Sequence, residues 1–66
     1  MSDIQQCVID YLIRMADWES LLFIHIELER AGFKYVLTRS ELHTLLKQMK
    51  KDGLIYYRYQ YARIKN

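Results

Sequence analysis

Apolar residues near the start of the chain recur at the spacing of an amphipathic helix. One stripe comprises Ile4, Val8, Tyr11, Leu12 and Met15. A second stripe, nearly opposite the first, comprises Ile9, Ile13 and Ala16. Because successive helical residues are turned by about 100°, this pattern predicts a helix over about residues 2–16 that is apolar on two sides. Ser2 and Gln5 fit a capping box at its start.

A second helical pattern covers about residues 18–31. Its core face comprises Leu21, Ile24, Leu28 and Ala31, and another side carries Trp18, Leu22 and Ile26. The Asp17 side chain is placed to cap the start of this helix. Gly32 is placed to end it in the left-handed conformation.

Both predicted helices carry more apolar surface than one small core needs. A chain of 66 residues buries only about 60% of the surface that it exposes when unfolded. The helices either sandwich each other and a third helix, or use their spare stripes to pair with a second copy. We favour a homodimer, and its expected interface comprises Ile9, Ile13, Trp18, Leu22 and Ile26.

Residues 39–52 carry the strongest helix signals in the chain. Thr38 and Glu41 fit a capping box at the start. The i, i+3, i+4, i+7 pattern that follows comprises Leu42, Leu45, Leu46 and Met49. Lys50 and Lys51 lie in the last turn, where the helix dipole favours cations, and Gly53 closes the helix.

Residues 54–65 have a β-prone composition that includes Ile55, Tyr56, Tyr57, Tyr59, Tyr61 and Ile64. One alternating face is apolar at both ends and polar in the middle, which favours a hairpin with its tip near residues 58–60. No Gly, Asn, Asp or Pro marks the turn, so one long strand that pairs with a second chain is the alternative. A short strand at Tyr35–Leu37 would lie beside this ribbon. The predicted fold is mainly α, with three helices and a C-terminal β-hairpin in a single domain over residues 1–66.

Charge is divided unevenly between the two halves of the chain. Residues 1–33 hold two basic and six acidic side chains, a net charge of −4, whereas residues 34–66 hold eight basic and two acidic ones, a net charge of +6. This asymmetry suggests a basic face for a polyanion, of which nucleic acid is the commonest. The alternative is that the two halves attract each other or a second copy.

The order of these elements resembles a known family. The resemblance is carried by Leu37-Thr38-Arg39-Ser40-Glu41-Leu42, by Leu45, Leu46 and Met49, and by Lys51-Asp52-Gly53-Leu54-Ile55. These residues are similar to the second half of winged-helix (winged helix-turn-helix) DNA-binding domains in small bacterial, archaeal and phage transcription regulators. The resemblance covers about residues 19–66. Two departures are a long connector from Gly32 to Leu37 and a ribbon without the glycine that usually forms a wing tip.

The resemblance implies that residues 39–52 form a recognition helix in the major groove of double-stranded DNA, and that residues 54–65 form a wing on the backbone. The DNA-binding residues that it implies are Lys34, Arg39, Ser40, His43, Thr44, Lys47, Gln48, Lys51, Arg58, Arg63 and Lys65. We therefore expect a small transcriptional regulator. The alternative is a protein–protein interaction module, such as a phage or plasmid adaptor, that uses Tyr56, Tyr57, Tyr59 and Tyr61.

Several other classes of protein are not expected. A single cysteine excludes an internal disulfide, and glycine at only two positions excludes a glycine-rich phosphate loop. Cys7, His25 and His43 lack metal-ligand spacing, and no pair of carboxylates falls in a predicted pocket. We expect no enzyme activity, no cofactor and no metal. The start of the chain lacks the features of a signal peptide and no apolar run is long enough to span a bilayer, so a cytoplasmic protein is expected.

Overall fold

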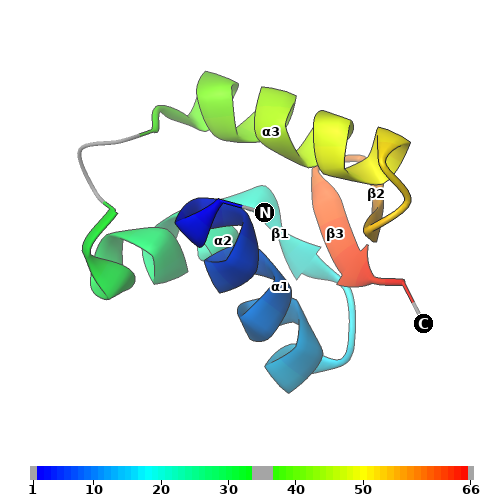
Figure 1. The fold of residues 1–66 in the computed structure, drawn as a ribbon, viewed down its shortest axis with the longest axis horizontal. Coiled ribbons are helices and arrows are strands. Elements are labelled where there is room, and N and C mark those ends of the chain that lie inside the picture. The colour runs from blue at the N-terminus through cyan, green and yellow to red at the C-terminus, as the bar shows by residue number, and fades with distance from the viewer. Residues whose placement is uncertain (1, 34–36, 66) are drawn as a thin grey trace.

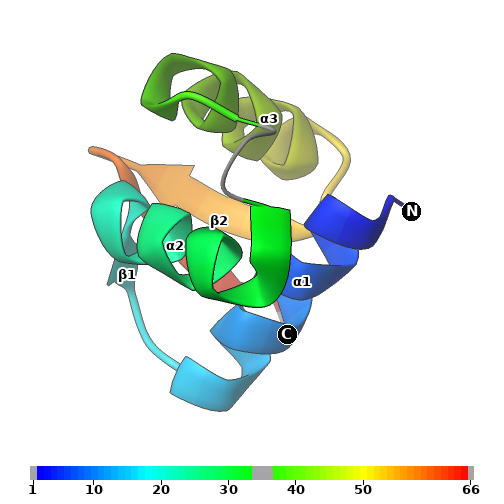
Figure 2. The same cartoon turned by 90° about the vertical axis from the view of Figure 1, so that its left-hand side faces the viewer.

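The computed structural model describes residues 2–33 and 37–65. In these residues the chain forms α1 (Asp3–Met15), β1 (Glu19–Ser20), α2 (Leu21–Leu28), the π-helical segment η1 (Glu29–Phe33), α3 (Arg39–Lys51), β2 (Ile55–Arg58) and β3 (Tyr61–Ile64). α3 lies along one side of the molecule and α1 and α2 lie on the other, with the sheet joining the two sides at one end (Figures 1 and 2). The predicted fold class, mainly α with a C-terminal hairpin, is confirmed.

Local capping places both ends of α1 where the sequence predicts them. The Ser2 hydroxyl accepts a hydrogen bond from the Gln5 backbone N–H at 3.2 Å. The Gln5 side-chain oxygen accepts one from the Ser2 backbone N–H at 3.0 Å, which completes the capping box. α1 ends at Ala16, which has a left-handed φ of 56° and whose N–H donates to the Leu12 carbonyl.

The second helix begins later than the predicted residue 18, because a short strand comes first. Glu19 pairs with Ala62 and Ser20 pairs with Tyr61, both in β3, so these residues are extended instead of helical. The resulting sheet is antiparallel with the order β1-β3-β2. A strand of two residues has no alternating pattern of its own, and it forms because the hairpin offers an edge to pair with.

The cap of α2 is also not the predicted one. The Ser20 hydroxyl accepts a hydrogen bond from the Phe23 backbone N–H at 3.2 Å and so caps the helix. The Asp17 carboxylate accepts from the adjacent Trp18 N–H at 2.7 Å and lies outside the helix. Pairing of Ser20 with β3 fixes its extended backbone, which is the conformation that an N-cap residue requires.

At its other end α2 stops before the predicted residue 31. The α-helix ends at Leu28 with Glu29 as its C-cap, and the segment Glu29–Phe33 that follows is kinked at Gly32, whose backbone is not helical. Gly32 has the predicted positive φ, at 98°, which glycine adopts without steric cost. Most of the strand predicted at Tyr35–Leu37 lies within residues 34–36, which are outside the described residues.

α3 agrees with its prediction to within one residue. The Thr38 hydroxyl accepts from the Glu41 N–H at 3.1 Å, and the Glu41 carboxylate accepts from the Thr38 N–H at 2.9 Å. At the other end Gly53 has a φ of 79°. The Leu54 N–H donates to the Met49 carbonyl at 3.0 Å, which completes the expected glycine cap.

β2 and β3 pair within the chain, from Ile55 opposite Ile64 to Arg58 opposite Tyr61. The ribbon is therefore an intrachain hairpin, as predicted, and not a long strand that awaits a second chain. Its two turn residues, Tyr59 and Gln60, have φ values of 52° and 60°. A two-residue turn of this kind normally uses Asn-Gly, because side-chain-bearing residues are strained at positive φ.

One hydrophobic core joins the three helices to the inner face of the sheet. Its buried residues are Val8, Tyr11, Leu12, Leu21, Ile24, Leu28, Leu42, Leu46, Met49, Ile55, Tyr57 and Ala62. Full burial of one such side chain contributes about 1.5–3 kcal/mol, so the inner stripe of α3 is held firmly against the core. In the part of the chain that the structure describes, no helix has both the length and the apolar character needed to cross a membrane.

Candidate nucleic-acid interface

Burial of one stripe of α3 determines which of its residues face water. Leu42, Leu46 and Met49 are completely buried. Ser40, Thr44, Lys47 and Lys51 lie on the opposite face and are exposed. The Thr44 hydroxyl donates to the Ser40 carbonyl at 3.2 Å, which leaves its oxygen able to accept a further hydrogen bond.

The two flanks of α3 carry different charges. His43, Lys47 and Lys50 follow one another at i, i+4 and i+7 and lie on the flank that faces the hairpin. Glu41 and Asp52 lie on the other flank, about half a turn away. The positive charge of the helix is therefore directed toward the hairpin.

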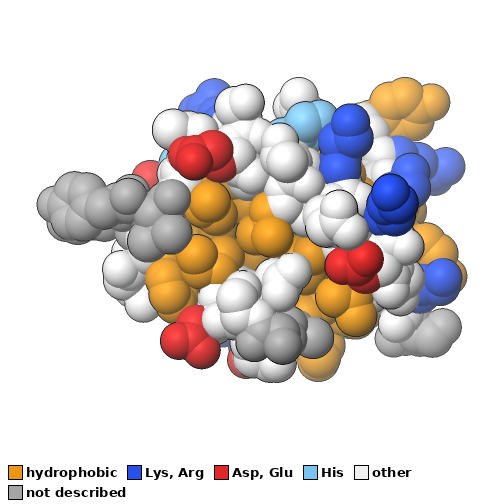
Figure 3. Space-filling view, turned by 45° about the horizontal axis from the view of Figure 1, so that its top comes forward, with side chains coloured by type: hydrophobic (Ala, Val, Ile, Leu, Met, Phe, Trp, Pro, Cys, Tyr) orange, Lys and Arg blue, Asp and Glu red, His pale blue; other side chains and the backbone are white. Residues whose placement is uncertain are grey.

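A groove of about 260 Å³ separates α3 from the hairpin. Its lining comprises His43, Lys47 and Lys50 from α3 and Tyr57, Arg58, Tyr59 and Gln60 from the hairpin. Three of these side chains are cationic, and no carboxylate is among the described residues that line it. Figure 3 shows Lys and Arg side chains gathered at one end of this face of the molecule. Such a groove favours an anion.

A hydrogen bond between the two walls fixes the shape of the groove. The His43 Nδ1 lies 2.7 Å from the Tyr57 hydroxyl, and the two ring centroids are 5.5 Å apart. Burial raises the pKa of the Tyr57 phenol, so the phenol keeps its proton at neutral pH. The predicted DNA-contacting residue His43 therefore also holds α3 against β2.

The structure divides the predicted DNA-binding residues among several places. His43, Lys47 and Arg58 come together in the groove. The exposed residues on the rest of α3 are Arg39, Ser40, Thr44, Gln48 and Lys51. The Gln48 side-chain amide donates to Asp52 at 3.0 Å. Arg63 lies opposite Tyr56 in the sheet, and the Lys65 ammonium lies 5.8 Å from the centre of the Tyr56 ring. Lys34 lies outside the described residues.

The structure adds residues to the groove that the sequence did not indicate. Lys50 was interpreted as a cation in the last turn of the helix, yet it completes the stripe that begins at His43. The i, i+4, i+7 spacing of that stripe is the signal that could have revealed it. Tyr59 and Gln60 join the groove because the turn places them beside α3.

The residues predicted for a dimer interface differ in how far they are exposed. Those that are exposed are Ile13, Leu22 and Ile26. Ile9 is half-buried and packs against the core. Trp18 lies beside the sheet, where the Arg58 guanidinium carbon is 5.1 Å from the centre of its ring. Phe23, which was not predicted, is 56% exposed beside Leu22.

Among residues 2–33 and 37–65, no three His, Cys, Asp or Glu side chains come together as a metal site. Burial raises the pKa of the Cys7 thiol, with Glu27 and Asp10 adding to the effect. The thiol is therefore protonated at neutral pH and weakly nucleophilic.

No protein-family model matches this chain, and no curated protein or solved structure matches it either. The candidate site is the groove between α3 and the hairpin, which is lined by the cationic side chains of Lys47, Lys50 and Arg58.

Proposed function

We propose that this chain is a winged-helix protein that binds double-stranded DNA and regulates transcription or a related event on DNA. α3 is the recognition helix and the β2–β3 hairpin is the wing. The observation that carries the proposal is the convergence of Lys47, Lys50 and Arg58 on one groove with no carboxylate among its described lining residues. The order of three helices and a basic hairpin supports it.

The dimensions of α3 suit a major groove. Its 13 residues extend for about 20 Å at about 1.5 Å per residue. A helix fits the major groove, which is about 12 Å wide. In this arrangement Ser40, Thr44 and Lys51 face the base edges, while Lys47 and Arg58 contact phosphates on either side of the groove.

The hairpin tip has the features of a contact surface. Tyr59 is 89% exposed, and both turn residues have a positive φ. Strain of this kind costs about 1–3 kcal/mol per residue and is concentrated at functional positions. The Leu21 N–H donates to the Gln60 carbonyl at 2.7 Å, which holds the tip in place against the start of α2. The tip is thus a fixed projection that carries Arg58 and Tyr59 toward DNA.

We also propose that two copies pair through the outer face of α2. Leu22, Phe23 and Ile26 lie within about 100° of one another around that helix, and each is more than 40% exposed. A helix that is apolar on all sides is normally buried. Sedimentation of the pure protein at micromolar concentration tests the pairing, and a sharp monomer of 8.1 kDa would reject it.

The alternative function, docking of the tyrosines on a protein partner, has weaker support. Tyr57 is buried and bonded to His43, so it is removed from the set. Tyr56, Tyr59 and Tyr61 are exposed, but Arg58 and Arg63 alternate with two of them in the sheet. That mixture of aromatic rings and cations favours an anionic partner.

Salt-dependent binding to duplex DNA of random sequence tests the proposal. If each protomer neutralises about four phosphates, the slope of log affinity against log salt is about −4 for a monomer and about −7 for a dimer. The measurement is fluorescence anisotropy of a labelled duplex from 50 to 200 mM salt. Binding that does not respond to salt, or no binding at tens of micromolar protein, would reject DNA binding.

Charge reversal locates the binding surface. Lys47→Glu combined with Lys51→Glu should abolish duplex binding, since it replaces two cations of the proposed interface with carboxylates that repel DNA. Lys47→Glu alone is compared with Arg30→Glu, which makes the same change of charge on the exposed η1 segment. Equal losses in these two single variants would show attraction to overall charge and would contradict a site on α3.

A further inference from the structure

We propose that the outer face of the sheet is a second nucleic-acid site, which binds a short single strand by stacking its unpaired bases. The site comprises Trp18, Tyr56, Arg58, Tyr61 and Arg63, with Lys50 at its edge. It shares Arg58 and Lys50 with the groove beside α3, but its stacking residues Trp18, Tyr56 and Tyr61 lie outside that groove, so the site would stand if the duplex-binding surface were disproved.

The pairing register places aromatic and cationic side chains alternately on this face. Tyr56 lies opposite Arg63, and Arg58 lies opposite Tyr61. Their neighbours Tyr57 and Ala62 point inward and are buried. Since residues directly opposite each other share one face of a sheet, the outer face presents two tyrosines and two arginines on crossing diagonals.

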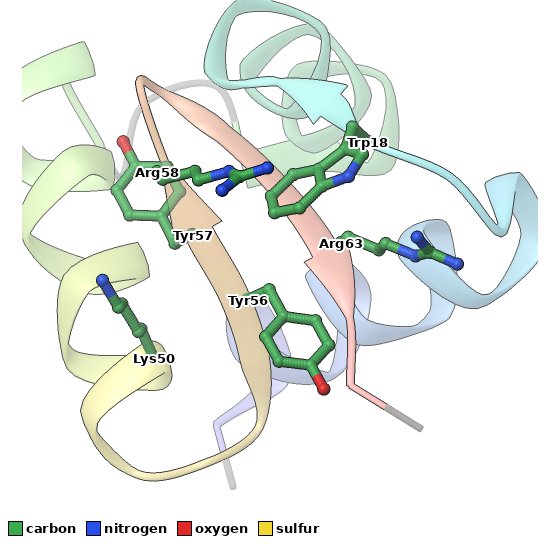
Figure 4. A pocket seen from close by; sticks show the side chains of 6 residues that line it. All are labelled: Trp18, Lys50, Tyr56, Tyr57, Arg58 and Arg63. Carbon is green, nitrogen blue, oxygen red and sulfur yellow. The ribbon is translucent and has the colours of Figure 1, made fainter.

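Trp18 completes the surface from the residue before β1. The Arg58 guanidinium carbon lies 5.1 Å from the centre of the Trp18 ring. Figure 4 shows Arg58 extended toward Trp18, with Tyr56 and Arg63 on neighbouring strands and Lys50 reaching from α3. A guanidinium plane stacks on bases as aromatic rings do, so the Arg58–Trp18 pair is itself a stacking surface.

The face is hollowed in two adjoining places. One hollow of about 330 Å³ is lined by Trp18, Lys50, Tyr56, Tyr57, Arg58 and Arg63. The other, of about 190 Å³, is lined by Trp18, Arg58, Tyr59 and Tyr61. Because Trp18 and Arg58 border both, two consecutive bases can lie on either side of the same pair.

The charge around the hollows specifies an anion. The two linings contain Lys50, Arg58 and Arg63, and no carboxylate is among the described residues that form them. Glu19 adjoins Trp18 but points to the other face, where it accepts a hydrogen bond from the Tyr11 hydroxyl at 2.9 Å. Asp17 is bonded to the Trp18 backbone N–H and does not line either hollow.

Aromatic rings together with cations favour unpaired bases over a duplex. In a duplex the faces of the bases are stacked on one another, and only their edges and the phosphates are accessible. In a single strand the faces are free, and one base stacked on an aromatic side chain is worth about 1–3 kcal/mol. The sheet face therefore has the chemistry for a single strand, whereas the outer face of α3, without aromatic residues, does not.

Trp18 makes the test direct, because it is the only tryptophan of the chain. Titration of the protein with a ten-nucleotide oligothymidylate at low salt should quench its fluorescence. A ten-nucleotide oligouridylate in parallel shows whether DNA or RNA is preferred, and quenching by either supports the site. An oligomer of the same length without bases should bind at least tenfold more weakly.

Variants separate stacking from charge. Tyr56→Ala and Tyr61→Ala should each lower the affinity for the oligonucleotide by about 5- to 100-fold, since each removes a ring on which one base stacks. Tyr56→Phe should bind the oligonucleotide with the affinity of the parent, because it keeps the ring. Met15→Ala, which shortens an exposed apolar side chain on α1 outside every proposed site, is the control and should bind as the parent does.

Three results would overturn the proposal: no quenching at 100 µM oligonucleotide, equal affinity for the base-free oligomer, or tighter binding of an acidic peptide such as polyglutamate. The last would assign the face to a protein partner. Failure of this site is distinguishable from failure of the duplex site. Lys47→Glu should weaken duplex binding and leave the quenching of Trp18 by the oligonucleotide unchanged. Tyr56→Ala should weaken the binding that quenches Trp18 and leave duplex binding unchanged.

Discussion

α2 and α3 bury equivalent inner faces in one core but expose very different outer faces. The inner stripes are Leu21, Ile24 and Leu28 in α2 and Leu42, Leu46 and Met49 in α3, and all six are buried. Outside, α2 exposes Leu22, Phe23 and Ile26, whereas α3 exposes Ser40, Thr44, Lys47 and Lys51. The inner faces follow from the need to form a core, so they carry no information about partners.

The outer faces are where the two helices differ in function. Removal of an apolar outer face from water lowers the free energy, so such a face suits contact with a second copy of the chain. A polar outer face with lysines is hydrated in the free protein, and its binding to DNA is favoured by release of the cations that surround the phosphates. The comparison therefore supports the two proposals, pairing through α2 and DNA binding through α3, and each can be tested separately.

The largest expected effect tests whether the inner faces are equivalent. Ile24→Ala in α2 and Leu46→Ala in α3 each remove a side chain that is at most 1% exposed. Each should lower the free energy of unfolding by about 2–5 kcal/mol, because a cavity is left in the core. Urea unfolding followed by circular dichroism measures both. A small loss for Ile24→Ala beside a large one for Leu46→Ala would show that α2 packs loosely.

The next effect tests the outer faces. Phe23→Lys should convert a dimer to a monomer and change the salt slope of duplex binding from about −7 to about −4. Thr44→Lys places the same side chain on α3 and should leave the oligomeric state unchanged while it strengthens duplex binding. Sedimentation and anisotropy measure the two outcomes. Loss of pairing in the Thr44 variant would place the dimer interface on α3.

A smaller effect distinguishes the caps of the two helices. Ser20→Ala and Thr38→Ala should each lower stability by about 1 kcal/mol, since each leaves a backbone N–H without its acceptor. The loss should be larger for Thr38, because it exchanges two hydrogen bonds with Glu41 whereas Ser20 makes one with Phe23. Thermal unfolding measures this as a shift of about 4–8 °C per kcal/mol. Equal shifts would mean that the Glu41 half of the box is ineffective.

The smallest effect is the pH dependence of the stability that the Thr38–Glu41 capping box gives to α3. Hydrogen bonds from Thr38, first from its backbone N–H, hold the pKa of Glu41 below its ordinary value of 4.5. A lowered pKa in the folded protein means that the stabilisation is complete above pH 4.5 and is lost as the pH falls through the folded-state value. The difference in stability between the parent and Glu41→Gln should therefore narrow on acidification. A constant difference from pH 7 to pH 3 would contradict the ionised cap.

Where the sequence predicted correctly, the interactions are local. The capping pairs Ser2–Gln5 and Thr38–Glu41 span three residues, and the glycine caps need only the residue itself and its neighbours. The hairpin was predicted from alternation even though Tyr59 and Gln60 are poor turn residues. Each of these features competes with few alternatives, so the local pattern decides it.

Where the prediction was wrong, a distant segment intervened. Residues 18–20 continue the helical pattern of α2, yet Glu19 and Ser20 pair with β3, more than 40 positions away in the chain. That pairing shifts the start of α2 and places Trp18 beside Arg58 instead of on a helix face. No pattern within the segment carries this information.

By itself, the sequence determined α1, α3, the hairpin and the basic character of the second half, because hydrogen bonds and apolar spacing within a few residues suffice for them. Only the tertiary structure decided that Lys47 and Lys50 meet Arg58 in one groove, and that Trp18 joins the tyrosines and arginines of the sheet. Both arrangements depend on which side of a helix the hairpin packs against. That choice follows from burial of the common core, to which residues from the whole length of the chain contribute.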